Sequence, residues 1–398
     1  MRIFKRTRLP ALGFLGMMVM ASQALAAAPT PNSPMSYWFE APGGAWTLSP
    51  NSSQLFSPSM VISPTALGHN NGEQAVHAFN VDANGSLWDS FSANPFSSPA
   101  TWTRTNVSSL TGAAVSTAVS VGALYFGGSL PSTQVWALSP AGHLLSFTTT
   151  ADGGNWQVFD LTSFSGSRAI LTTAPHPIQF GSTVHVYATD NNKHLHDFYK
   201  TASANWRDID LTNTTTGAPH AIFGVPFAYG GNSIQTVSTS ASGDLEIFIQ
   251  TVFSDGTINF NVRPSAFDIT QLSGNTEFPF GTSSPVVTGN STVNIFVDDT
   301  NSNLVDFTKT PTGPWQVSTV ASLGQRNLTP SALWNASLGL HVVTNNGSGQ
   351  LTDYFSGSSG PPFNSSGLPS AGTAFGDPSM VGIASGQFGP TLVTFSNF

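Results

Sequence analysis

Residues 184–212 read VHVYATDNNKHLHDFYKTASANWRDIDLT and contain most of a unit that recurs along the chain. An alternating run over 183–190 leads through the turn Asp190-Asn191-Asn192-Lys193 into a second run that begins at Leu195. Alternating residues on either side of an Asp/Asn-rich turn predict a β-hairpin. Trp206 then opens a further strand-like stretch, which ends in Asp210-Leu211-Thr212.

The unit occurs six times, and leucines anchor it at nearly regular intervals: Leu87, Leu144, Leu195, Leu245, Leu304 and Leu351. After a similar short interval, each leucine is followed by an aromatic residue: Trp102, Trp156, Trp206, Phe260, Trp315 and Phe363. Four strand positions fit within each unit, and the first often begins at a proline. A repeat of about 50 residues that is built from short strands is typical of a propeller blade.

The two ends of the chain complete each other. Residues 35–49, with Trp46 at the aromatic position, match only the third and fourth strands of a unit. Residues 377–398 match only the first two, and Pro378–Val381 repeats the letters of Pro58–Val61. We therefore predict an all-β, seven-bladed propeller over 27–398. Six blades lie between about 55 and 370, and the terminal strands share the seventh, so that no long sheet edge is left open.

The composition indicates an exported β-protein. Residues 1–26 combine a basic start, an apolar stretch and Ala24-Leu25-Ala26, which is the pattern of a cleaved signal peptide. The remainder has eight basic and 20 acidic residues, a formal charge of −12, which disfavours nucleic acid as a partner. No later stretch is long enough to span a membrane. The chain has no cysteine, which excludes thiol catalysis and cysteine metal sites.

The repeated tryptophans have two interpretations. They could form a ring of platforms on which apolar ligand faces, such as those of sugars, stack, and the candidates are Trp102, Trp156, Trp206 and Trp315. They could instead pack neighbouring blades together, because every blade must bury both of its faces. Phe260 and Phe363 at the same position favour the packing interpretation, since phenylalanine has no polar group.

An aspartate stands two positions after the anchoring leucine in four units: Asp89, Asp197, Asp306 and Asp353. Four equivalent carboxylates could bind sugar hydroxyls through charge-assisted hydrogen bonds. The alternative is that they are buried and paired with polar groups inside the protein. Ser146 and Ile247 replace the aspartate in the other two units.

The remaining motifs predict neither catalysis nor a cofactor. His185, His194 and His196 could approach one metal ion, but a fourth ligand is not evident, and we predict no metal site. No pair of carboxylates has a spacing that singles it out for glycoside hydrolysis, and a nucleophile elbow and a phosphate-binding glycine loop are both absent. A binding protein is therefore favoured over an enzyme.

The blade pattern of residues 184–212 resembles the repeats of bacterial seven-bladed propeller lectins of the tectonin-like, fucose-binding type, and of a related uncharacterised bacterial repeat family. The resemblance covers nearly all of the chain after residue 26. It implies shallow sugar pockets between adjacent blades, and it matches the family's aromatic to Trp102, Trp156, Trp206 and Trp315. We expect a secreted, multivalent and non-catalytic lectin that binds glycans. The alternatives are an exported glycan hydrolase with an acid-lined central pocket, and a protein-interaction scaffold.

Overall fold

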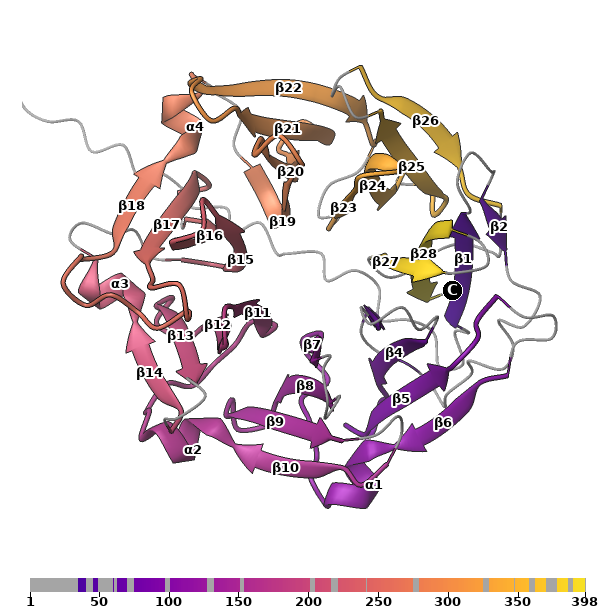
Figure 1. Ribbon diagram of the computed structural model, residues 1–398, viewed down its shortest axis with the longest axis vertical. Coiled ribbons are helices and arrows are strands. Elements are labelled where there is room, and N and C mark those ends of the chain that lie inside the picture. The colour runs from indigo at the N-terminus through magenta and orange to yellow at the C-terminus, as the bar shows by residue number, and fades with distance from the viewer. Residues whose placement is uncertain are drawn as a thin grey trace, which may run out of the picture.

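The computed structural model describes residues 35–40, 46–48, 60, 63–69, 75–96, 101–126, 132–150, 154–200, 205–215, 221–240, 242–274, 279–324, 329–346, 348–357, 362–369, 378–385 and 389–397. They form seven four-stranded antiparallel sheets arranged as the blades of a ring (Figure 1). The predicted seven-bladed propeller is thus confirmed. The predicted signal peptide lies outside the described residues. Within them, no helix has the length and apolar character needed to cross a membrane.

The first strand of each blade lies nearest the centre of the ring (Figure 1). In the order of blades 1 to 6 and the terminal blade, these strands are β3 (Thr65–Gly68), β7 (Gly122–Phe126), β11 (His176–Phe180), β15 (Val225–Tyr229), β19 (Pro279–Val287), β23 (Ser331–Asn335) and β27 (Ser379–Ser385). The second strands are β4 (Val76–Val81), β8 (Ser132–Leu138), β12 (Thr183–Thr189), β16 (Ser233–Thr239), β20 (Val293–Asp299), β24 (Gly339–Asn345) and β28 (Gly389–Asn397).

Third strands start at or next to the anchoring leucines, as predicted. They are β5 (Leu87–Ser92), β9 (Leu144–Thr149), β13 (Leu195–Lys200), β17 (Leu245–Thr251), β21 (Asn303–Lys309), β25 (Leu351–Ser356) and β1 (Met35–Glu40). The fourth strands form the rim: β6 (Thr103–Asn106), β10 (Gln157–Asp160), β14 (Arg207–Asp210), β18 (Ser265–Asp268), β22 (Trp315–Ser322), β26 (Asn364–Gly367) and β2 (Thr47–Leu48).

The terminal blade closes the ring through the two ends of the chain. Its strand order is β2-β1-β28-β27, and β1 pairs with β28 in an antiparallel register that runs from Met35 opposite Asn397 to Glu40 opposite Leu392. The predicted sharing of one blade between the termini is therefore confirmed. Every residue of β1 has a partner in β28, which leaves no open edge between the N-terminal and C-terminal strands.

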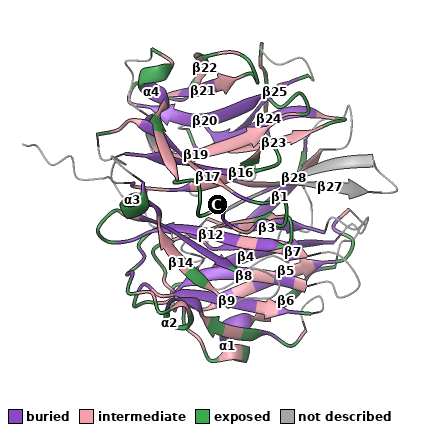
Figure 2. Cartoon of the chain, turned by 60° about the vertical axis from the view of Figure 1, so that its left-hand side comes forward, coloured by how far each residue is buried: buried purple, intermediate pink, exposed green. Residues whose placement is uncertain are grey.

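The hydrophobic core is divided among the spaces between blades. Each cluster of buried apolar side chains combines residues of two neighbouring blades, such as Phe79 of blade 1 with Phe147 of blade 2. Second strands are consequently buried on both faces, and every residue of β4, β20 and β24 is buried. Figure 2 shows these inner strands as mostly buried, with exposed residues at the rim. Large side chains recur in the sequence because every blade needs them on both faces.

Short helices follow four of the rim strands, which the all-β prediction did not include: α1 (Val107–Thr111), α2 (Leu161–Ser165), α3 (Leu211–Thr214) and α4 (Ile269–Leu272). An Asp or Asn at the end of each rim strand caps the helix that follows. Asp160 accepts a hydrogen bond from the N–H of Ser163 and so caps α2. The hydroxyl of Thr162 accepts from the N–H of Leu144 at 2.8 Å, which fixes α2 to the start of the third strand. The same bond recurs in blades 3 and 4.

The letters shared with Pro378–Val381 predict the first strand of blade 1 at Pro58–Val61, and this assignment is wrong. The first strand of blade 1 is β3, which begins at Thr65. The hydroxyl of Ser379 accepts from the N–H of Ala66, just as that of Ser331 accepts from Met380. This shared contact identifies Thr65, Ser331 and Ser379 as equivalent positions. Met60 instead forms an isolated bridge with Asp82 ahead of the blade.

Candidate functional site

The predicted aspartates lie inside the protein, in the seams between blades. Asp89, Asp197, Asp306 and Asp353 are each at most 1% exposed. Three of them pair with a histidine of the neighbouring second strand, at 2.9 Å in each case: His77 with Asp89, His185 with Asp197, and His341 with Asp353. The register places each histidine diagonally opposite its aspartate, so the pairs form within one blade.

Two of these aspartates also accept a hydrogen bond from the next blade in the ring. Trp46 Nε1 of the terminal blade donates to Asp353 Oδ2 at 3.0 Å. Gln250 Nε2 of blade 4 donates to Asp197 Oδ2 at 2.9 Å. In these contacts the carboxylate links two blades. This arrangement agrees with the alternative that the aspartates are buried and paired with polar groups inside the protein.

Asp306 lacks both kinds of partner. Asn294 stands where three other blades have histidine, and Phe363 of blade 6 stands where the terminal blade has Trp46. Neither carboxylate oxygen of Asp306 forms a hydrogen bond with the described residues. Burial raises the pKa of Asp306 to about 7, and nearby Thr308 and the backbone of Ile295 offset this only in part.

The four predicted tryptophans differ in their surroundings. Trp102 and Trp156 are 8% and 6% exposed. They form edge contacts with aromatic residues of the preceding blade, Tyr37 and Phe79 respectively. Trp315 is half-buried and packs against the cluster shared by blades 4 and 5. Among the eight predicted site residues, Trp206 is the one that lines a described pocket.

The pocket at Trp206 lies between blades 2 and 3 and has a volume of about 300 Å³. Ser146 and Gln134 line it from blade 2, at the positions that hold the buried Asp–His pair in other blades. The smaller serine leaves room in this seam. Lys200 and Asn205 add polar groups from blade 3, and two exposed phenylalanines, Phe159 and Phe164, form the outer wall.

A second pocket, of about 370 Å³, lies in the next seam, between blades 3 and 4. Phe260 and Arg263 line it from blade 4, and Asn213 of α3 from blade 3. Phe260 is 64% exposed and does not hold the aromatic position predicted for it. The register places Pro264 there, directly ahead of Ser265, which pairs with Ile249. The two pockets share an aromatic wall, one basic side chain and an amide, and no carboxylate lines either of them.

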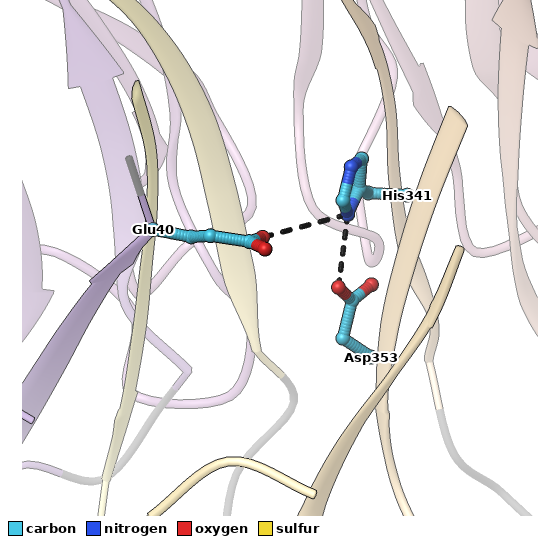
Figure 3. Close-up of side chains that lie close together, drawn as sticks. All are labelled: Glu40, His341 and Asp353. Atoms are coloured by element: carbon cyan, nitrogen blue, oxygen red, sulfur yellow. Dashed lines mark hydrogen bonds and ion pairs between the residues drawn. The ribbon is translucent and has the colours of Figure 1, made fainter. Parts of the chain in front are cut away.

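A third group of side chains lies at the seam between blade 6 and the terminal blade. Figure 3 shows the carboxylates of Glu40 and Asp353 directed toward the imidazole of His341. His341 Nδ1 is 2.9 Å from Asp353 Oδ2 and 3.8 Å from Glu40 Oε2. Burial raises the pKa of Glu40 to about 7. Sequence reasoning did not find this group, because Glu40 lies near the opposite end of the chain from the other two.

The histidines considered for a metal site are held apart by separate acids. His185 pairs with Asp197, and His194 Nδ1 lies 2.9 Å from Asp210 Oδ2. His196 Nδ1 lies 3.0 Å from Asp208. Each imidazole is oriented by its own carboxylate, so the three do not form a common ligand set.

Comparisons with solved structures align most of this chain with three proteins. BP39L lectin from Burkholderia pseudomallei aligns with a TM-score of 0.58 and 18% identity, over 82% of this chain and 90% of its own. A triple arginine-to-alanine mutant of AofleA from Arthrobotrys oligospora aligns with a TM-score of 0.50 and 9% identity, over 87% and 94%. The fungal lectin of Aleuria aurantia, a six-bladed propeller with a fucose recognition mode, gives 0.48 and 11%, over 79% and 99%.

Neither a family model nor a curated protein matches the sequence. At these low identities the structural likeness establishes the propeller fold alone.

Proposed function

We propose that the chain is a secreted, multivalent and non-catalytic carbohydrate-binding protein. The observation that carries this proposal is the pair of pockets in consecutive seams, between blades 2 and 3 and between blades 3 and 4. Their volumes, about 300 and 370 Å³, suit a monosaccharide or the end of a glycan chain. BP39L, which shares the fold, is itself a lectin.

The chemistry of both pockets fits a sugar. The Trp206 indole can stack on the C–H face of a pyranose ring, because its face carries partial negative charge and its area is large. Asn205 and Lys200 can bind hydroxyl groups, and Lys200 would strengthen such a bond through its charge. Phe260, Asn213 and Arg263 offer the same combination in the other pocket.

The pocket linings support binding over hydrolysis. Glycoside hydrolysis uses a pair of carboxyl groups on either side of the scissile bond. The side chains that line the two pockets include no Asp or Glu, so neither pocket supplies such a pair. Several weak sites on one rigid ring raise the avidity for a multivalent glycan surface well above the affinity of a single site.

A glycan array followed by calorimetry tests the proposal. The mature chain is expected to bind a defined set of glycans with more than one site per chain. Trp206→Ala should weaken the binding at one site at least about fivefold, since an aromatic contact contributes about 1 kcal/mol beyond the buried area. Phe267→Ala is the matched control, because Phe267 is an exposed phenylalanine of blade 4 outside both pocket linings. Unaltered binding by Trp206→Ala, or turnover of a fluorogenic glycoside, would overturn the proposal.

A further inference from the structure

Two carboxylates and one imidazole lie close together at the seam between blade 6 and the terminal blade. Glu40 comes from β1 of the terminal blade, and His341 and Asp353 come from β24 and β25 of blade 6. One ligand atom from each lies within 4.8 Å of the other two. His341 is 3% exposed and Asp353 is 1% exposed, while Glu40 is half-buried. The group is a compact set of one imidazole nitrogen and two carboxylates (Figure 3).

The outer nitrogen of His341 faces a backbone carbonyl. Nε2 lies 3.4 Å from the oxygen of Leu338, which can only accept a hydrogen bond. Nε2 therefore carries a hydrogen. Nδ1 also carries one and donates it to Asp353 Oδ2 at 2.9 Å, and loss of this proton on metal binding would make the Nδ1 lone pair available beside the two carboxylates. Metal-binding histidines are commonly held in this way, with the second nitrogen donating to a carbonyl.

An equivalent seam elsewhere in the ring shows what the carboxylate of Glu40 changes. Gln250 holds the sixth position of the third strand in blade 4, as Glu40 does in the terminal blade. Gln250 donates to Asp197, whose partner His185 lies between that carboxylate and the oxygen of Gly256. A doubly protonated His185 balances the charge of Asp197 there, and the amide satisfies a further lone pair.

At the seam between blade 6 and the terminal blade, which we call the closing seam, the carboxylate of Glu40 takes the place of the Gln250 amide. A hydrogen-bond acceptor therefore replaces a donor. Glu40 Oε2 and Asp353 Oδ1 are buried and form no hydrogen bond with any described residue. Even a doubly protonated His341 leaves the group with one excess negative charge. A buried charge without a partner is costly. The geometry calls for a further cation.

We propose that Glu40, His341 and Asp353 bind one divalent transition-metal ion of the Zn²⁺ class, which goes beyond the proposed glycan binding. Two carboxylates and a neutral imidazole balance two positive charges, and the nitrogen ligand favours such an ion over Mg²⁺ or Ca²⁺. Trp46, which donates to Asp353 Oδ2, orients that ligand from the terminal blade. The ion would tie the terminal blade to blade 6 and so strengthen the closure of the ring.

The test uses the mature, tag-free chain after treatment with a chelator, titrated with Zn²⁺ by calorimetry. We expect one Zn²⁺ per chain, weaker binding of Mg²⁺, and a rise in the unfolding temperature of about 3 °C when free Zn²⁺ is about 100-fold above its Kd. Glu40→Gln should lower the Zn²⁺ affinity at least about tenfold. This variant should fold, because it reproduces the arrangement of Gln250 with Asp197.

Glu246→Gln is the matched control, since Glu246 is another acid whose pKa burial raises to about 7, but it lies in blade 4, away from the proposed ligands. It should bind Zn²⁺ as the wild type does. Absence of stoichiometric binding, equal binding of Mg²⁺, or unchanged Zn²⁺ affinity in Glu40→Gln would each overturn the proposal. The readout requires no glycan, so failure here leaves the proposed lectin function to its own test.

Discussion

Replacing Asp306 with asparagine should stabilise the protein in neutral and alkaline solution. Asp306 is fully buried in blade 5, and its carboxylate has no hydrogen-bonding partner among the described residues. Asparagine has nearly the same shape and does not ionise. The substitution therefore removes the cost of burying a charge while it leaves the packing intact.

The magnitude follows from the pKa of Asp306, which burial raises from 3.8 to about 7. This difference corresponds to about 4 kcal/mol of unfavourable free energy for keeping the group ionised in the folded state. Between these two pKa values the folded state holds a proton that the unfolded state has lost. The stability contributed by Asp306 is thus complete below pH 3.8 and falls as the pH rises through about 7.

Urea unfolding of the wild type and Asp306→Asn at pH 4, 6 and 8 measures the effect. The variant should match the wild type near pH 4 and exceed it by about 2 to 4 kcal/mol at pH 8. Asp197→Asn is the control, because His185 and Gln250 both bond its carboxylate, and it should lose about 1 to 3 kcal/mol at pH 8. Equal destabilisation by both variants at every pH would refute the reasoning.

Three further substitutions test the seams and caps. Asn294→His should lower the pKa of Asp306 in an NMR titration, because histidine at this position bonds the aspartate at 2.9 Å in three other blades; an unchanged pKa would contradict the equivalence. Asp160→Ala should cost about 1 kcal/mol of unfolding free energy through the lost cap of α2, measured by urea unfolding. Gly122→Ala should lower the free energy of unfolding by about 3 kcal/mol, because the added Cβ would lie 2.3 Å from the Pro175 oxygen of the next blade. A variant that unfolds at the same temperature as the wild type would show that this contact is not tight.

The fold was predictable because its determinants are local and repeated. Each anchoring leucine starts or nearly starts a third strand, since a buried leucine follows a hairpin turn in each of the six continuous blades. The closure of the ring was predictable too, because each end of the chain supplies a complementary half-blade. Residues 58–61 misled because identical letters do not fix strand pairing, and β3 begins later, at Thr65.

The candidate site was predictable only in part, because sequence spacing does not reveal what faces a side chain from the next blade. Trp206 lines a pocket, while Trp156 is buried. The difference lies in the preceding blade: blade 2, which faces Trp206, has Ser146 at the aspartate position, and blade 1, which faces Trp156, has Asp89 there. Phe260 was assigned to a position that Pro264 holds. The connection between β17 and the rim strand β18 is longer than in the other blades with a described connection, and it contains an additional bridge between Val252 and Ile258.

The group at the closing seam lay beyond sequence reasoning for a similar reason. Glu40 meets His341 and Asp353 only after the whole ring has formed and its ends have joined. No local motif contains the three residues. A repeat alignment could point to Glu40, since Gln250 holds the equivalent position in blade 4, but the contact itself requires the structure.

A crystal structure of the mature protein with a glycan selected from the array would show directly whether the pockets between the blades bind sugar. We expect sugar density in the seam between blades 2 and 3, with a pyranose ring against the Trp206 indole, and in the next seam beside Phe260 and Arg263. Sugar bound in the centre of the ring, or elsewhere with both seams unoccupied in the complex, would contradict this expectation.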